Sequence, residues 1–310
     1  MGYSIIDKNK KTDKKKANVS FLAIDPEWTL DEIIFSQSMK EQLQDVVSFC
    51  SKKDQIVEKW ELDRFLKGKG CIGINLWGIP GTGKSIAAEA IASALHKKLI
   101  QASYSTLMDS LQGNTEKNIT SLFETAVAED CVILFDEADG LLSARKTGGS
   151  NSDSSNLIKS HMLNILDRSN AIVVFTTNLF KSYDRAFVRR ILWNIEVPAP
   201  GYDELIKIWQ LHLGLKVPKD ITYEELAEIT INISKGKSMQ VTGGDVRKLT
   251  LVFCTQLASR RYSSITKEVA ASVIRKYLDD LQESSPAKKA VEQELSQEQM
   301  SDKIKNEIKN

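Results

Sequence analysis

Short apolar runs alternate with longer segments of helical periodicity over the first two thirds of the chain. Within Gly83–Leu95 and Thr115–Ala128, apolar residues recur at the spacing of one helical face. The apolar runs have the length of strands, and they are Ile72–Trp77, Leu99–Ala102, Cys131–Phe135, Ala171–Thr176 and Ile195–Val197. Because uninterrupted apolar runs are typical of strands buried on both faces, the alternation predicts an α/β fold with a parallel sheet flanked by helices.

The pattern changes after Pro198-Ala199-Pro200-Gly201. No strand-like run follows, and four segments have the periodicity of helices: 202–213, 223–233, 243–260 and 266–281. We therefore predict a large α/β domain over residues 25–200, followed by a small all-helical domain over residues 201–282.

The two ends of the chain differ from both domains. Residues 1–24 are rich in lysine, and residues 283–310 are rich in Glu, Gln, Lys and Ser. Segments of such composition bury too little apolar surface to fold alone, so we expect both to be flexible. The lysines leave open a contact with nucleic acid or with an acidic partner.

Composition limits the classes of protein to consider. The 42% apolar and 27% charged residues indicate an ordinary globular protein, and 42 Lys and Arg against 41 Asp and Glu give a net charge of +1. No global field therefore draws the molecule to nucleic acid or a membrane. No apolar run approaches the ~20 residues of a membrane span. Four cysteines without close pairs favour reduced thiols, so a cytoplasmic protein is expected.

One motif points directly to chemistry. The octapeptide Gly78-Ile79-Pro80-Gly81-Thr82-Gly83-Lys84-Ser85 follows a predicted strand and opens a predicted helix, which is the context of a phosphate-binding P-loop. Its backbone N–H groups would face phosphate oxygens, Lys84 would span the β- and γ-phosphates, and the Ser85 hydroxyl would bind Mg²⁺. The nucleotide-binding residues predicted here are Gly78, Pro80, Gly81, Thr82, Gly83, Lys84, Ser85 and Ile86.

Polar residues follow two other predicted strands. Asp136 and Glu137 come directly after Phe135, and Asn178 follows the strand that ends near Thr176. Since ligands of open α/β sheets bind at the carboxyl ends of strands, these side chains are expected beside the P-loop. Asp136 would hold Mg²⁺, Glu137 would polarise the attacking water, and Asn178 would orient that water.

These motifs together resemble those of the AAA ATPases, the branch of the AAA+ superfamily that contains microtubule-severing, membrane-fusion and peroxisomal remodellers. The resemblance covers roughly residues 25–282. It rests on G-I-P-G-T-G-K-S, on I-L-F-D-E-A-D and on T-T-N-L-F-K-S-Y-D-R-A-F-V-R-R-I. It implies a P-loop NTPase sheet followed by a helical lid, with ATP and Mg²⁺ as ligands.

The resemblance also implies roles for individual residues. Asn178 would be the sensor 1 residue, and Arg189 and Arg190 would be arginine fingers that complete the site of a neighbouring subunit. Ile33 and Ile34 fall in the segment that resembles the adenine clamp. Gly244 and Arg247 fall in Thr242–Leu249, which resembles the sensor 2 helix, although Arg247 could equally be a surface residue.

The resemblance further implies a central pore. Leu111 stands where the family usually has an aromatic pore-loop residue, and Arg145–Ser155 would be a second pore loop, Gly/Ser-rich and mobile. Leucine offers less contact area than an aromatic ring, so weaker threading or partial unfolding of a substrate is expected.

The function implied is an ATP-driven ring motor, a homo-oligomer and expected hexamer, that remodels a protein substrate brought by a separate adaptor. The compact form is similar to prokaryotic ATPases that remodel HORMA-domain proteins. The alternative is a nucleic-acid-associated AAA+ ATPase of the clamp-loader or helicase-loader type. The lysine-rich segment favours this alternative, and the near-zero net charge disfavours it.

Overall fold

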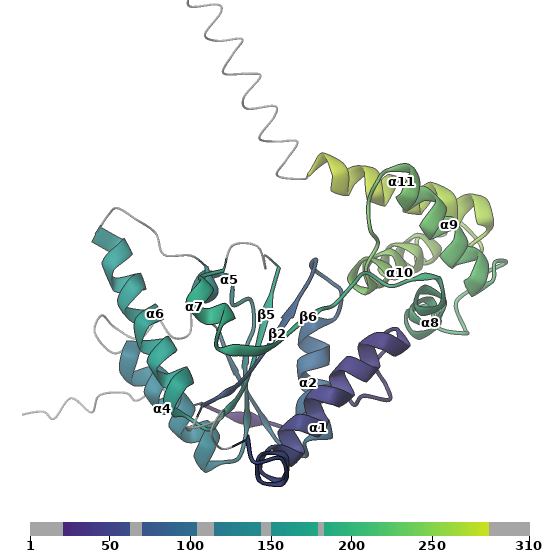
Figure 1. Ribbon diagram of the computed structural model, residues 1–310. Helices are drawn as coiled ribbons and strands as arrows, with labels where there is room; N and C mark the ends of the chain where they lie inside the picture. Colours follow the sequence, from purple (N-terminus) through teal and green to yellow (C-terminus); the bar gives the residue numbers. More distant parts are fainter. Residues whose placement is uncertain (1–20, 63–69, 104–114, 144–149, 179–182, 285–310) are drawn as a thin grey trace, which may run out of the picture.

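The computed structural model describes residues 21–62, 70–103, 115–143, 150–178 and 183–284. A central sheet lies between two layers of helices, and the last four helices form a group beside it (Figure 1). The strands are β1 (Ala23–Ile24), β2 (Ile72–Trp77), β3 (Leu99–Ala102), β4 (Val132–Phe135), β5 (Ile172–Thr177) and β6 (Ile191–Glu196). The helices are α1 (Gln37–Lys59), α2 (Lys84–Ala94), α4 (Thr115–Ala128), α5 (Asp139–Leu142), α6 (Ser150–Arg168), α7 (Arg185–Val188), α8 (Tyr202–His212), α9 (Tyr223–Gly236), α10 (Gly243–Ala258) and α11 (Lys267–Glu283).

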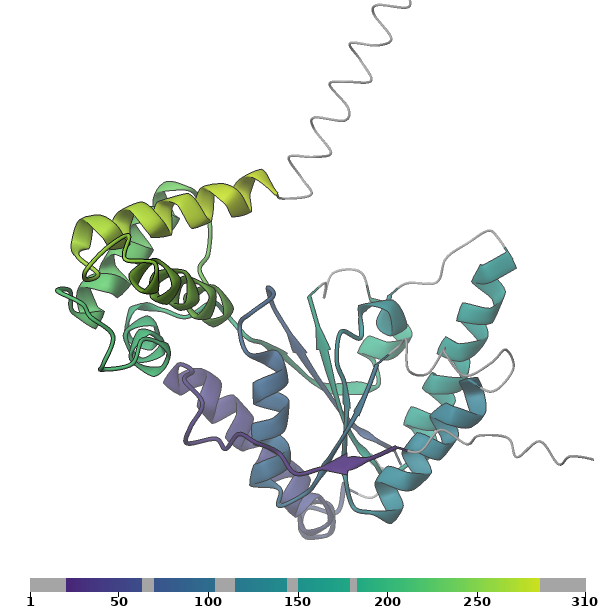
Figure 2. The same ribbon diagram turned by 180° about the vertical axis from the view of Figure 1, so that it is seen from behind.

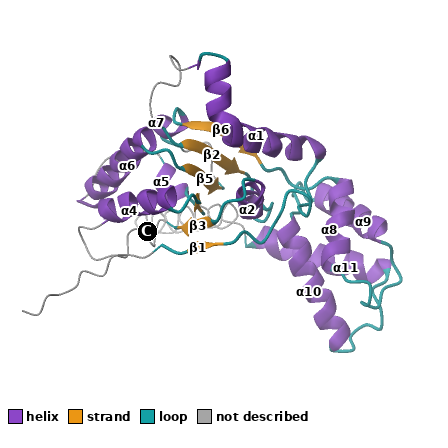
Figure 3. Cartoon of the chain, turned by 90° about the horizontal axis from the view of Figure 1, so that it is seen from below, coloured by secondary structure: helices purple, strands orange, loops and turns teal. Residues whose placement is uncertain are grey.

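The six strands are hydrogen-bonded in the order β1-β3-β4-β5-β2-β6. All pairings are parallel except that of β1 with β3, and Figure 3 shows the strands nearly end-on, with α8–α11 to one side. The predicted α/β fold with a parallel sheet and a helical C-terminal part is therefore confirmed. After β2 the chain crosses to β3, and after β5 it passes over β2 to β6. This reversal places a topological switch point at the carboxyl end of β2.

Two apolar cores hold the helices against the two faces of the sheet. Successive residues of β4 point to opposite faces: Ile133 and Phe135 pack with α4 and α6, whereas Val132 and Leu134 pack with α1 and α2. Figure 2 shows the same two layers from behind. Because both faces are covered, the interior strands need apolar residues at most positions, which explains the runs in the sequence, although Asn75 of β2 and two threonines at the end of β5 are buried as well.

Helices α8–α11 form the lid, which has a core of its own. The rings of Trp209 and Phe253 lie 6.1 Å apart at its centre. The start of α9 and the start of α10 are each stabilised by a capping box, in which a threonine and an acidic residue satisfy each other's backbone N–H groups. The lid therefore has defined helix starts and an independent apolar core.

The lid meets the P-loop at the start of α10. The backbone N–H of Gly244 donates to the carbonyl of Gly81 at 3.1 Å. Gly81 has φ +84°, and a Cβ atom on it would lie 2.6 Å from Thr242 Oγ1. Asp245, the partner of Thr242 in the capping box, also accepts a 2.7 Å bond from the Tyr277 hydroxyl of α11. This joint ties three parts of the chain together through close backbone approach.

Three element predictions are wrong in extent. β6 begins at Ile191, not Ile195: it is an edge strand whose residues alternate between buried and exposed, and Asn194 separates Ile191-Leu192-Trp193 from the apolar Ile195. β1 (Ala23–Ile24) pairs with β3, inside a segment expected to be flexible through residue 24. α6 begins at Ser150, within the predicted loop Arg145–Ser155. Serine, asparagine and aspartate favour helix starts as well as loops, which explains the last error.

Other features were missed or lie outside the described residues. Helix α1 was not predicted, although Ser36 caps it and its apolar residues are buried against the sheet. The ends of β4 and β5 differ from prediction by one residue. Residues 1–20, 285–310 and the predicted pore residue Leu111 are not described, and the domain boundaries stay predictions. No helix in the described part of the chain combines the length and the apolar character needed to cross a bilayer.

The joint between lid and P-loop gives a first prediction. Gly81→Ala should lower the free energy of unfolding by about 1 to 3 kcal/mol, because alanine is strained at positive φ and its methyl group would strike Thr242. Thermal unfolding measures the change. Gly214→Ala is the control, because a Cβ there has no atom within 4 Å. Equal melting temperatures for the two variants would contradict the tight joint.

Candidate active site

A cavity of about 660 Å³ lies between the carboxyl edge of the sheet and the lid. Its size suits a small-molecule ligand. Predicted site residues that line it are Ile33, Ile34, Pro80, Gly81, Thr82, Gly83, Lys84, Ser85, Ile86, Asp136, Glu137, Asn178, Gly244 and Arg247. Gly78 borders the loop without lining the cavity, and Arg189 and Arg190 lie elsewhere. The structure thus brings together residues from five separate parts of the sequence.

The loop after β2 has the backbone geometry of an anion cradle. Gly83 precedes α2 with φ +95°, a conformation that L-residues rarely adopt, and it directs the chain into the helix. A Cβ on Gly83 would lie 3.3 Å from the ring of Phe35, which closes the cavity on the side of the segment before α1. The N-terminus of α2 therefore opens on the cavity with its N–H groups, which favours a negatively charged ligand.

Lys84 is the central cation of the site. Its Nζ donates to the carbonyls of Gly78 at 2.9 Å and Ile79 at 3.0 Å, and to Asn178 Oδ1 at 2.9 Å. Burial lowers the pKa of the ammonium, and the carboxylates of Asp136, Asp139 and Glu137 oppose that shift. The side chain is 8% exposed. A buried ammonium that lines a cavity fits the β- and γ-phosphates of a nucleotide.

A set of oxygen atoms lies beside the lysine. Ser85 Oγ donates to Asp136 Oδ1 at 3.0 Å, and Thr176 Oγ1 donates to the same carboxylate oxygen. Hydroxyl and carboxylate oxygens are the ligands that Mg²⁺ prefers, with nucleotide phosphates supplying others. The oxygens of Ser85 and Asp136 therefore fit the ligand set of a magnesium ion.

Glu137 is held by its backbone, not by its carboxylate. Its φ is +52°, and its N–H donates to Thr176 Oγ1 at 3.1 Å. Among the described residues the carboxylate makes no hydrogen bond or ion pair, and the residue is exposed at the cavity. A non-glycine residue at positive φ is uncommon and points to a constrained local role. The carboxylate is thus directed to the cavity with its acceptor capacity free for a water.

Asp139 orients the sensor segment, and sequence reasoning missed it. It accepts from the backbone N–H of Asn178 at 3.2 and 3.3 Å and from the Thr177 hydroxyl. Asp139 lies in the first turn of α5, directly after the β4 carboxylates. Its position three residues after Asp136 was the available signal, but only the fold reveals that it faces β5.

The lid contributes a second missed residue, His212 at the end of α8. It lines the cavity with Arg247, and burial together with the positive charge of Arg247 lowers the pKa of its imidazole. Arg247 is exposed on α10, at the cavity margin. The sequence offered no motif for His212, because only the packing of α8 against α10 brings it to the site.

The two arginines lie at the opposite edge of the sheet. A Cβ on Gly73, near the start of β2, would lie 3.2 Å from the Arg190 carbonyl, whereas the P-loop begins at Gly78. Five residues of strand separate these points by about 17 Å. Neither arginine lines the cavity of its own chain.

Comparisons with known proteins agree with this geometry. The model of the ATPase family associated with various cellular activities (AAA) matches residues 74–199. The chain is 28% identical over 242 residues to proteasome-activating nucleotidase 1 of Haloferax volcanii, covering 74% of this chain and 58% of that protein. It is 31% identical over 191 residues to the ATPase-like fidgetin of Schizosaccharomyces pombe, covering 57% and 28%.

A solved structure has the same fold. The crystal structure of the FIGL-1 AAA domain superimposes with a TM-score of 0.62 at 22% identity, covering 84% of this chain and 89% of that one. The chain spans just over half the length of the Haloferax relative and just over a quarter of the fidgetin relative. The family resemblance is confirmed at this level: residues 74–199 match the AAA ATPase family, and the relatives and the solved structure that match the chain include proteins named for that ATPase domain.

Proposed function

We propose that the chain is a Mg²⁺-dependent ATPase that works as a homo-oligomeric ring, a hexamer in the family it resembles, and remodels a protein substrate. The observation that carries the ATPase proposal is the convergence of Lys84, Asn178, Ser85 and Asp136 within hydrogen-bond distance at one edge of the sheet. Four groups from three strand ends meet there with the charges that a nucleoside triphosphate requires.

Each residue has a defined task in hydrolysis. Lys84 would exchange its carbonyl partners for oxygens of the β- and γ-phosphates and balance the charge that develops there. Glu137 would accept a proton from the attacking water, and Asn178, held by Asp139, would orient that water in line with the γ-phosphate. Ser85 and Asp136 would hold Mg²⁺, whose chemistry when bound is to supply positive charge against the phosphates.

The position of the arginines supports assembly. A finger stabilises charge on the γ-phosphate only by direct contact, and Arg190 lies about 17 Å from the P-loop of its own chain. Charge stabilisation at each site would then come from the neighbouring subunit. A head-to-tail ring offers every site such a neighbour.

The proposal that the substrate is a protein rests on the resemblance to known proteins. Relatives named as a proteasome-activating nucleotidase and as vacuolar protein sorting-associated protein 4 match this chain, which favours a protein substrate, delivered by a separate adaptor. The HORMA-domain class is one such substrate. Leu111 and the lysine-rich N-terminal segment, which bear on the pore and on the nucleic-acid alternative, lie outside the described residues.

Two variants test the chemistry. Lys84→Ala should abolish nucleotide binding, because it removes the buried cation of the site, whereas Glu137→Gln should bind ATP normally and lower turnover at least about 100-fold. Binding of a fluorescent ATP analogue and release of phosphate measure the two effects. Equal turnover in the wild type and both variants would overturn the assignment.

Mixed assemblies test the ring. The double variant Arg189→Ala, Arg190→Ala keeps an intact P-loop but offers no finger, and Lys84→Ala offers fingers but holds no ATP. Mixed at equal concentration, they should regain activity at about a quarter of interfaces, where a normal site meets a normal finger. Phosphate release after subunit exchange measures the recovery.

The control mixture combines Lys84→Ala with Glu137→Gln. Both changes damage the ATP-bearing side of an interface, so no arrangement of the two restores a complete site. Recovery in the control as well, or in neither mixture despite proven co-assembly, would contradict a finger supplied in trans.

A further inference from the structure

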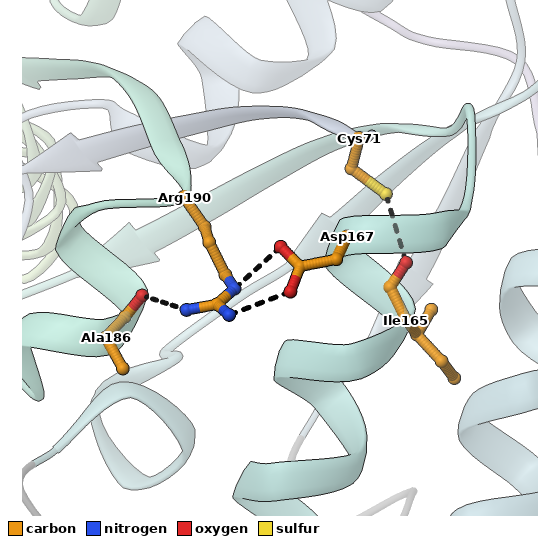
Figure 4. Close-up of polar contacts among 5 residues, drawn as sticks. All are labelled: Cys71, Ile165, Asp167, Ala186 and Arg190. Carbon is orange, nitrogen blue, oxygen red and sulfur yellow. Dashed lines mark hydrogen bonds and ion pairs between the residues drawn. The ribbon is translucent and has the colours of Figure 1, made fainter. Parts of the chain in front are cut away.

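Arg190 is committed to partners within its own chain. Its Nε and Nη2 donate to the two carboxylate oxygens of Asp167 at 2.8 and 2.7 Å, and its Nη1 donates to the carbonyl of Ala186 at 3.0 Å (Figure 4). A bidentate guanidinium–carboxylate pair is charge-assisted and fixes the orientation of both groups. The third bond closes the turn between α7 and β6.

The acidic partner stands on a rigid support. Asp167 is the penultimate residue of α6, and the preceding carbonyl, that of Leu166, accepts from the backbone N–H of Cys71 at 2.9 Å. The Cys71 thiol also points to the carbonyl of Ile165 (Figure 4). The end of α6 is thereby attached to the chain just before β2, so the ion pair joins the turn between α7 and β6 to the start of the neighbouring strand β2.

Arg189 contrasts with its neighbour. It follows the last residue of α7 and is exposed, and its guanidinium makes no hydrogen bond or ion pair with the described residues. Arg190 follows it directly and is held against α6 by Asp167. Arg189 is the C-cap of α7 and is exposed, so its five donors are available to a partner outside the described residues.

We propose that Arg190 is a positioning residue and that Arg189 is the finger: the Arg190–Asp167 pair locks the turn between α7 and β6 and so sets the direction of Arg189. This inference rests on the proposed ATPase function and divides between two residues a role that resemblance assigns to both. For Arg190 to reach a neighbour's phosphate, it would have to release all three of its partners.

A double-mutant cycle tests the proposal. Asp167→Asn and Arg190→Gln should each lower ATP turnover by about 10- to 100-fold, the range expected when a contact is misplaced by about 1 Å, and the double variant should lose no more than either single. Arg189→Gln should lose about 1000-fold or more. Arg168→Gln, the same change at an exposed arginine next to Asp167, should equal the wild type.

If Arg190 were a second finger, the opposite pattern would be expected. Arg190→Gln would then match Arg189→Gln, and Asp167→Asn would leave turnover unchanged or higher, because it frees the guanidinium. Charge reversal adds a rescue: Asp167→Arg combined with Arg190→Asp should restore turnover relative to each single reversal if the pair positions Arg189. The proposal would be overturned if the double reversal did not restore turnover and Arg190→Gln lost as much turnover as Arg189→Gln.

A readout without ATP separates this inference from the proposed function. Hydrogen–deuterium exchange of residues 184–192 should rise by the same factor in Asp167→Asn and Arg190→Gln, and remain at the wild-type rate in Arg189→Gln. A wild type that does not hydrolyse ATP but shows this pattern would retract the ATPase alone. Unchanged exchange, or a rise over the whole domain, would overturn the local positioning role.

Discussion

A buried ammonium group organises the carboxyl edge of this sheet. Lys84 enters from the first turn of α2 and is held by two carbonyls of the loop before it and by Asn178 from the end of β5. Removing a charge from water is costly unless polar groups surround it. The strands beside β2 end in polar residues, which surround this ammonium. The acidic residues after β4 balance its positive charge. Burial thus acts differently in two parts of the sheet: it favours apolar side chains in the interior, and at the carboxyl edge it requires polar partners for the charge of Lys84.

The two edges of the sheet hold the residues of two different proposed functions, nucleotide binding and the contact with a neighbouring subunit. The carboxyl edge holds the predicted nucleotide site and meets the lid through Gly81 and Gly244. The opposite edge holds Arg190, clamped to the end of α6. Strands β2–β6 run in the same direction, so their amino ends and their carboxyl ends lie at two edges that are about one strand length apart. An arginine at this opposite edge is too far from the P-loop of its own chain to contact a phosphate bound there. It could contact a phosphate only in a neighbouring molecule, and the fold therefore supports the proposed assembly.

Much of the fold and the main site was predictable from sequence. Strands β2 and β3 agree with the apolar runs to the residue. The P-loop motif alone predicted a nucleotide phosphate as the ligand. The sequence failed where tertiary context decides. β6 is an edge strand in which the polar Asn194 interrupts the apolar residues, so it lacks the continuous apolar run of an interior strand. Asp139 is the last residue of I-L-F-D-E-A-D, but only the packing of α5 beside β5 shows that it holds Asn178. His212 carries no motif, and only the packing of α8 beside α10 brings it to the cavity.

Arg189 and Arg190 show the same limit most sharply, because they are identical side chains at adjacent positions. No pattern of sequence distinguishes them, and the resemblance gives both one role. Their environments differ through Asp167, a residue more than twenty positions earlier in the chain, which pairs with Arg190, whereas Arg189 is exposed. The proposed difference in role thus arises from how α6 ends on the sheet, a feature that local sequence around the arginines does not contain.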